Sequence, residues 1–157
     1  MSTGMSLIEP FNTDSVLLDL EAVDKAGILK EMVAHAVAAK SLPSARREQV
    51  LEMLVEREQR GSTAFGKGIA MPHARVPKLR KGCGVVARAP AGVDFRAVDG
   101  EPVQVFVMLV SPDSRAEEHL ATLRWISAAA RDADFRSFIV QASTAEQVLE
   151  VLRERVP

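Results

Sequence analysis

The sequence predicts an α/β fold, a single-domain sandwich in which a mixed β-sheet is flanked by α-helices on both faces. Segments with apolar residues at helical spacing alternate along the chain with short apolar runs of strand length. The run 103–110 is nearly all apolar, which is typical of a central strand covered on both faces. No internal repeat or linker interrupts the 157 residues, so we expect one domain over 1–157.

The N-terminal third predicts one strand and two helices. Residues 1–12 lack periodicity and are expected to be a loose segment, followed by a strand over 16–20. Asp24 is placed to cap the first helix, and Pro43 and Gly61 suit the start and the end of the second. The expected buried positions of the two helices are Ile28, Leu29, Met32, Val33, Ala36 and Val37, and then Val50, Leu51, Leu54 and Val55.

Charged runs lie beside these buried faces. The runs 46–48 and 56–58 are expected to be solvated, with Arg57 in the last turn of its helix. The basic connection 75–81 allows two interpretations, either a solvated loop or a rim that attracts an acidic or phosphorylated partner.

The second half of the chain predicts two strands and two helices. The strands cover 83–89 and 103–110, with a turn-rich stretch over 92–102 between them. A capping box at 114–117 is expected to start one helix, and a second box at 144–147 starts the last helix. The last helix has an apolar stripe of Val148, Leu149 and Leu152.

Composition excludes several classes of protein. With 47% hydrophobic and 26% charged residues and a net charge of −1, nothing predicts binding to nucleic acid or to an anionic membrane. No apolar run reaches the roughly 18 residues that a membrane span needs, and the start lacks the order of a signal peptide. Cys83 is a single cysteine in an apolar strand pattern, which predicts a buried structural thiol and suits a cytoplasmic location.

The chemically most informative stretch is 57–77. Gly66, Lys67 and Gly68 can adopt backbone angles that aim successive N–H groups at one oxyanion. Residues 69–71 have the pattern of a brief buried strand that Pro72 would end.

This arrangement would deliver His73 at a strand end, beside the glycine turn and between the basic residues Lys67 and Arg75. Such a position suits a histidine that carries a negatively charged group. A plain glycine-rich connection with a surface histidine remains an equal alternative on these grounds.

A nucleotide-binding loop is the other interpretation of this stretch. Residues 61–67 fit G-x-x-x-x-G-K, but Gly68 stands where a magnesium-binding Ser or Thr should follow. The expected order of elements is also reversed, because the segment leaves a helix and enters a strand. Both failures argue against an ATP site.

The other two histidines lie on predicted helices. His119 either covers the edge of the core or faces His73, and its spacing favours the first interpretation. His35 lies at the edge of an apolar stripe and is expected to be structural and partly exposed. Three scattered histidines without ligand spacing do not make a metal site, so no metal is expected.

One motif extends beyond these local arguments. Arg57-Glu58, Ser62-Thr63 and Gly66-x-Gly68-x-Ala70-x-Pro72-His73 resemble the active-site segment of the IIA domains of the sugar phosphotransferase system, of the mannitol/fructose type and its nitrogen-regulatory relatives. The resemblance continues through 92–95, 98–100, the strand at 103–110 and His119-Leu120, and covers roughly 54 to 126. Ala74 and Lys67 depart from the residues common in the family; neither removes a reacting group, but Lys67 could alter partner choice.

The resemblance implies a function. His73 would accept a phosphoryl group, as a tele-phosphohistidine, from the phosphohistidine of an HPr-type carrier, without nucleotide, magnesium or another cofactor. His119, Arg57 and the turn Gly66–Gly68 would stabilise the transferred charge. The acceptor downstream would be a regulatory target or a sugar-specific IIB cysteine, and the absence of attached IIB and IIC segments favours regulation. The sequence leaves a monomer and a homodimer both open.

Overall fold

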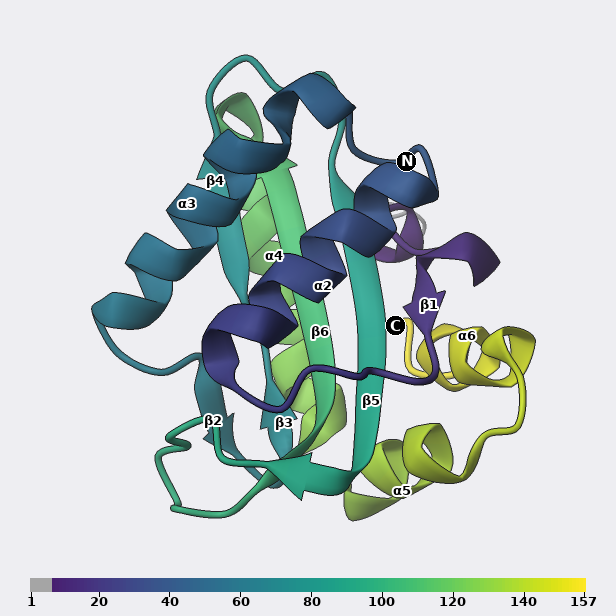
Figure 1. Ribbon diagram of the computed structural model, residues 1–157. Coiled ribbons are helices and arrows are strands. Elements are labelled where there is room, and N and C mark those ends of the chain that lie inside the picture. The colour runs from purple at the N-terminus through teal and green to yellow at the C-terminus, as the bar shows by residue number, and fades with distance from the viewer. Residues whose placement is uncertain (1–6) are drawn as a thin grey trace.

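The computed structural model describes residues 7–157 and contains one mixed six-stranded sheet. The strand order is β1-β5-β6-β3-β2, with β4 pairing β6 beyond the end of β3. Strands β5 and β6 are antiparallel, whereas β1 runs parallel to β5, and β3 and β4 run parallel to β6 (Figure 1). The strands are β1 Val16–Leu17, β2 Ala64–Gly66, β3 Ile69–Ala70, β4 His73–Val76, β5 Cys83–Val93 and β6 Val103–Pro112.

Helices cover both faces of this sheet, which confirms the predicted sandwich. Helices α2 (Lys25–Ala38) and α3 (Arg47–Gln59) lie on the near face in Figure 1, and α4 (Ala116–Ala130) lies behind the sheet. Helices α5 (Ala133–Gln141) and α6 (Ala145–Arg153) contribute side chains to the same hydrophobic core as α4. None of the described helices is long and apolar enough to cross a membrane.

The apolar strand β6 divides its side chains between two cores. Phe106, Met108 and Val110 belong to the core beneath α2 and α3, and Val105, Val107 and Leu109 to the core beneath α4, α5 and α6. This alternation follows from the two-residue period of a strand. Because both faces of β6 are covered by helices, its sequence is apolar almost without interruption, as predicted.

The predicted helix caps have mixed outcomes. Asp24 caps α2 by accepting from the Gly27 amide at 2.7 Å, and Thr144 caps α6 by accepting from the Gln147 amide at 3.1 Å. The predicted box at 114–117 is wrong. The chain leaves β6 through a short 3-10 turn, Asp113–Arg115, so α4 begins at Ala116 with no side-chain cap bond.

The described part of the N-terminal segment is packed rather than loose. Phe11 is 5% exposed, its ring lies over Gly84, and the Gly84 amide donates to the carbonyl of Pro10 at 3.0 Å. A β-carbon on residue 84 would lie 2.3 Å from that ring, so only glycine admits this contact. The prediction of a loose 1–12 is therefore wrong for 7–12; residues 1–6 lie outside the described part.

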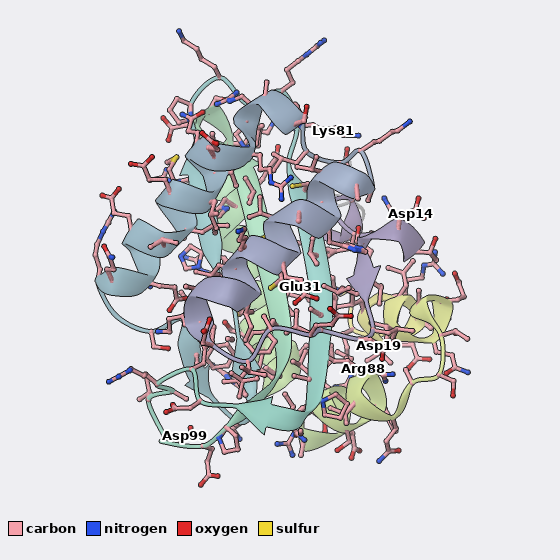
Figure 2. The ribbon with its side chains drawn as sticks, viewed as in Figure 1. Asp14, Asp19, Glu31, Lys81, Arg88 and Asp99 are labelled. Carbon is pink, nitrogen blue, oxygen red and sulfur yellow. The ribbon has the colours of Figure 1, made fainter. Side chains whose placement is uncertain are left out.

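Two further elements differ from the predictions. Strand β1 spans two residues instead of 16–20, and α5 had no predicted counterpart. The Arg88 guanidinium, labelled in Figure 2, holds the end of α5 by donating to the carbonyls of Ile139, Val140 and Ala142. An arginine from a distant strand thus satisfies the carbonyls at that helix end, which local sequence signals do not reveal.

Candidate functional site

His73 is the first residue of β4 and lies opposite Leu109 of β6. Along β4 the buried Ala74 and Val76 face the core of α2 and α3, so His73 and Arg75 lie on the other face. The sequence placed His73 after a strand end and 75–81 in a connection. Instead, Pro72 separates two short strands that pair in succession with β6, and the second begins at His73.

One ring nitrogen of His73 is fixed by the backbone. Its Nδ1 lies 2.8 Å from the carbonyl oxygen of Met71. A carbonyl oxygen can only accept, so Nδ1 carries the proton and Nε2 keeps a free lone pair. Burial lowers the pKa of His73, an effect that the Arg57 charge reinforces and the Met71 hydrogen bond and Glu58 oppose. The imidazole is therefore neutral near pH 7, with Nε2 available as a nucleophile.

His119 of α4 faces His73, with 5.6 Å between the ring centroids and 55° between the ring planes. The spacing in the sequence favoured a position of His119 at the edge of the core; in the structure it faces His73 instead. His119 is 5% exposed, and its Nδ1 lies 2.7 Å from the hydroxyl oxygen of Ser111. Sequence reasoning missed Ser111; the available signal was a hydroxyl residue at the end of the central strand, eight positions before His119.

The Ser111 hydroxyl can accept from a protonated Nδ1 or donate to an unprotonated one. In the second case Nε2 of the neutral His119 carries the proton and becomes a hydrogen-bond donor. Burial lowers the pKa of His119 to about 4, with the charges of His73 and Arg75 adding to the effect. Ser111 can therefore support His119 in either protonation state.

These depressed pKa values predict a pH dependence of stability. The pKa of His119 falls from 6.5 to about 4 on folding, so the unfolded chain binds the proton more readily. The contribution of neutral His119 to the free energy of unfolding is complete above pH 6.5 and is lost as the pH falls toward 4. In urea unfolding at about pH 7.5 and about pH 5, wild type should lose more stability between the two conditions than His119→Gln. Equal losses in the two proteins would contradict the assignment, because all other titrating groups are shared.

Arg57 lies in the last turn of α3, which packs against β4. The half-buried Arg57 donates from Nη1 to the carbonyl of Gly61 at 2.9 Å, which holds the guanidinium at the end of its helix. Its positive charge lowers the pKa of His73, and that of Arg75 lowers the pKa of His119. Each imidazole thus lies within the electrostatic influence of one arginine, which favours binding of an anion between them.

The turn Gly66–Gly68 is not brought to His73. Its φ angles are 120°, 59° and 75°, all in the left-handed region. However, the Lys67 amide donates to the Asp99 carboxylate at 3.0 Å, so a carboxylate of this chain occupies that amide. Asp99 lies at the end of the molecule opposite to Lys81 (Figure 2).

The strand register gives the separation of this turn from the histidine. Ile69, the residue after the turn, lies opposite Val105, whereas His73 lies opposite Leu109. Four residues of strand correspond to about 13 Å. The turn therefore lies too far along the sheet for its amides to contact a group on His73.

Glu58 departs from the predicted solvated face. It is 5% exposed, pairs with Lys25 at 3.1 Å, and accepts from both the amide and the hydroxyl of Thr63. The stretch after α3 folds back over the helix end, which buries this carboxylate while Glu56 stays exposed. Glu58 thereby fixes the same short loop that holds the Arg57 guanidinium through Gly61.

Replacing Glu58 with alanine is expected to destabilise the protein by about 2–4 kcal/mol, because Lys25 loses its partner and the buried Thr63 amide loses its acceptor. Glu56→Ala is the matched control on the same helix, since its pair with Arg60 is exposed on both sides and should contribute less than about 1 kcal/mol. Urea unfolding measures both changes. Similar small losses in the two variants would show that the buried pair is not structural.

Cys83 and the ligand-type side chains take no evident part in this site. Cys83 is buried, as predicted, and burial raises the pKa of its thiol to about 11, which disfavours the reactive thiolate. Across residues 7–157, no three His, Cys, Asp or Glu side chains are grouped so that they could hold a metal ion.

Together these features define an α/β domain with a neutral imidazole that has an unprotonated Nε2 at a sheet edge, beside a second histidine and two guanidinium groups. The chain belongs to the EIIA 2 family of the phosphoenolpyruvate-dependent sugar phosphotransferase system, whose family model matches residues 9–155. This finding confirms the resemblance seen in the sequence.

The chain is similar both to nitrogen regulatory proteins and to a sugar-specific EIIA component. A nitrogen regulatory protein of Pseudomonas aeruginosa is 40% identical over 78% of this chain and 79% of its own length. Another from Bradyrhizobium diazoefficiens is 33% identical over 88% of this chain and 89% of its own. A fructose-specific EIIA component of Haloferax volcanii is 30% identical over 98% of this chain and 97% of its own.

Solved structures confirm the architecture. The nitrogen regulatory protein IIA-Ntr of Neisseria meningitidis superposes with a TM-score of 0.79 at 30% identity, covering 92% of this chain and 97% of its own. The mannitol IIA of Escherichia coli has a TM-score of 0.75 at 18% identity, covering 90% and 98%, and shares the fold.

Proposed function

We propose that this protein is a phosphoryl carrier with a regulatory role, and that His73 Nε2 accepts the phosphoryl group from the phosphohistidine of an HPr-type protein. The observation that carries the proposal is the hydrogen bond from His73 Nδ1 to the Met71 carbonyl. It leaves Nε2 unprotonated, on a ring whose centroid lies 5.6 Å from that of His119. Phosphorylation at Nε2 corresponds to the tele-phosphohistidine expected from the family.

In the transfer, the Nε2 lone pair forms a P–N bond while the P–N bond to the carrier histidine breaks. The electron pair of the broken bond stays on the carrier's imidazole nitrogen. The other ring nitrogen of the carrier histidine is protonated during the transfer, so the leaving imidazole is neutral, and phosphorylated His73 keeps the Nδ1 proton in its bond to the Met71 carbonyl. The phosphoryl group passes through a loose transition state that needs alignment and neutralisation of its oxygens more than covalent help. Arg57 and the Nε2–H of His119 supply that neutralisation, and Ser111 orients His119.

A phosphohistidine donor is already activated, so this route needs neither nucleotide nor metal from the protein. The negative charge of a phosphoryl group on His73 would also raise the pKa of His119, because an opposite charge favours the protonated form. His119 would then become a stronger donor when the phosphoryl group is present. We expect this exchange to take place in the cytoplasm.

The choice between regulation and sugar transport depends on the downstream partner. The nitrogen regulatory names of the 40% and 33% identical relatives support regulation. The fructose-specific relative, 30% identical along nearly the whole chain, supports the second candidate, a IIA that passes phosphate to a IIB cysteine.

A paired assay separates the two candidates. Phosphorylated protein is mixed with candidate IIB domains, and its loss of label is followed; in parallel, wild type and His73→Ala are used to capture partners from the native host. A stable partner that is retained by His73→Ala and released on phosphorylation supports regulation, because the added charge rejects a partner docked over His73. Rapid discharge to a IIB domain without a stable partner overturns the regulatory proposal in favour of sugar transport.

A further inference from the structure

A concave surface is lined by residues at the end of α2 and in the connection from β4 to β5. Both segments lie at the same end of the molecule (Figure 1). We call this surface the basic groove. Its volume is about 630 Å³, its floor is formed by Val37, Leu42 and Leu79, and its rim carries Lys40, Arg80 and Lys81. Leu42 and Leu79 belong to the core beneath α2 and α3, so the groove lies on the opposite face of the sheet from His73.

The cations on the rim are not held in ion pairs. No acidic residue lines the basic groove, and the three rim cations form no ion pair within residues 7–157. Lys78, beside the floor residue Leu79, is also exposed and unpaired within this range. The chain as a whole has a net charge of −1, so this is a local concentration of positive charge, with Lys81 projecting at this end (Figure 2).

The backbone beneath two of these lysines is in a conformation that favours glycine. Lys40, just past the end of α2, has φ of 62°, and Lys78 has φ of 61°. A residue with a β-carbon costs roughly 1–2 kcal/mol in this left-handed region, and glycine is the usual solution after a helix end. Two lysines therefore lie beside the groove at positions where glycine would give a more stable backbone.

The basic groove shares two lining residues with a cavity beside His119. Ser41 and Lys81 line the groove on one side and, on the other, a cavity of about 90 Å³ that is bordered by His119 and Ser111. The Arg46 guanidinium donates to the carbonyls of Pro77 and Lys78, which ties the chain leading out of β4 to the start of α3. An occupant of the groove would therefore contact segments that continue directly into the residues around His73.

We propose that the basic groove docks an acidic amphipathic segment of a partner protein. Apolar side chains of this segment would enter the groove over Val37, which is partly exposed beside the buried Leu42 and Leu79, and its carboxylates would pair with Lys40, Arg80 and Lys81. An apolar floor inside a cationic rim matches this chemistry. The groove has no aromatic side chain on which nucleic-acid bases could stack. Its apolar residues are recessed rather than projecting, unlike those of a membrane-binding surface.

The test uses a fluorescent helical peptide of about 16 residues with leucine on one face and glutamate on the other, and two comparison peptides. In one, lysine replaces glutamate; in the other, serine replaces leucine. Binding is followed by anisotropy at low and moderate salt, and the contact surface is mapped by amide chemical shifts. We expect the glutamate–leucine peptide alone to bind and to shift the amides of Val37, Leu42 and Leu79.

The informative variant is Lys40→Gly combined with Lys81→Ala. Lys40→Gly removes a charge while relieving the backbone, so the variant keeps its fold and its thermal midpoint should not fall. We expect binding to weaken at least about tenfold, while Lys30→Ala, which removes an exposed lysine from α2, and His73→Ala leave it unchanged.

Four outcomes would overturn the proposal. They are no binding up to about 1 mM peptide, equal binding by the double variant, equal binding of the serine peptide, and tighter binding of single-stranded DNA or anionic vesicles than of the peptide. Because His73→Ala should retain this binding, a failure here is distinguishable from a failure of the phosphoryl-carrier proposal.

Discussion

Replacement of His73 by alanine is expected to abolish phosphorylation of this protein by a phosphorylated HPr-type carrier. His73 Nε2 is the nucleophile of the proposed reaction, with its lone pair freed by the bond between Nδ1 and the Met71 carbonyl. Without that nitrogen no acceptor stands at this position. The measurement is the transfer of labelled phosphate, with the acid lability of the product identifying a phosphohistidine.

Two control variants make this result specific. His35→Ala should be labelled normally, because His35 bonds through Nε2 to the backbone carbonyl of Asp14 at 2.8 Å. Asp14 lies on the opposite side of the molecule from β4 (Figures 1 and 2). His119→Ala should still be labelled to completion, although slowly. Label retained by folded His73→Ala would place the acceptor elsewhere and remove the basis of the proposed function.

The second large effect is expected at the groups that stabilise the transferred charge. His119→Ala and Arg57→Ala should each slow transfer by roughly 10²–10³-fold, as the loss of one preorganised donor typically does. His119 faces the acceptor ring at 5.6 Å, and the Arg57 charge acts on the same ring. Because stabilisation of the transition state serves both directions, forward and reverse transfer should slow together. Quenched-flow measurement of labelled phosphate gives both rates.

Variants at neighbouring residues test whether the slowing is specific to the site or follows from any loss of charge. Arg60→Ala removes an exposed guanidinium three residues after Arg57 and should transfer at the wild-type rate. Ser111→Ala should slow transfer less than His119→Ala, since it frees the orientation of His119 without removing the ring. Wild-type rates in both directions for His119→Ala and Arg57→Ala would mean that the site is wrongly placed.

Local patterns were sufficient to predict the layers of this protein. The apolar run of β6 predicted a strand covered on both faces, and the stripe from Ile28 to Val37 predicted the buried face of α2, although Val37 itself is partly exposed. Both depend on short-range geometry, the two-residue period of a strand and the 3.6-residue period of a helix. The motif ending in His73 also lies within one continuous stretch, so the sequence alone could propose a reacting histidine and its family.

Contacts between distant segments were decided only in three dimensions. Sequence adjacency suggested that the turn Gly66–Gly68 would serve His73, but pairing with β6 carries the extended chain about 13 Å between them. The same sheet brings Ser111 and His119 to His73, although they lie 38 and 46 residues further along the chain. Glu58 had the pattern of a surface charge and is buried because the chain after α3 folds back over it. Chain order determines which side chains are available, whereas strand register and helix packing determine which of them meet, because those contacts depend on spatial rather than sequence separation.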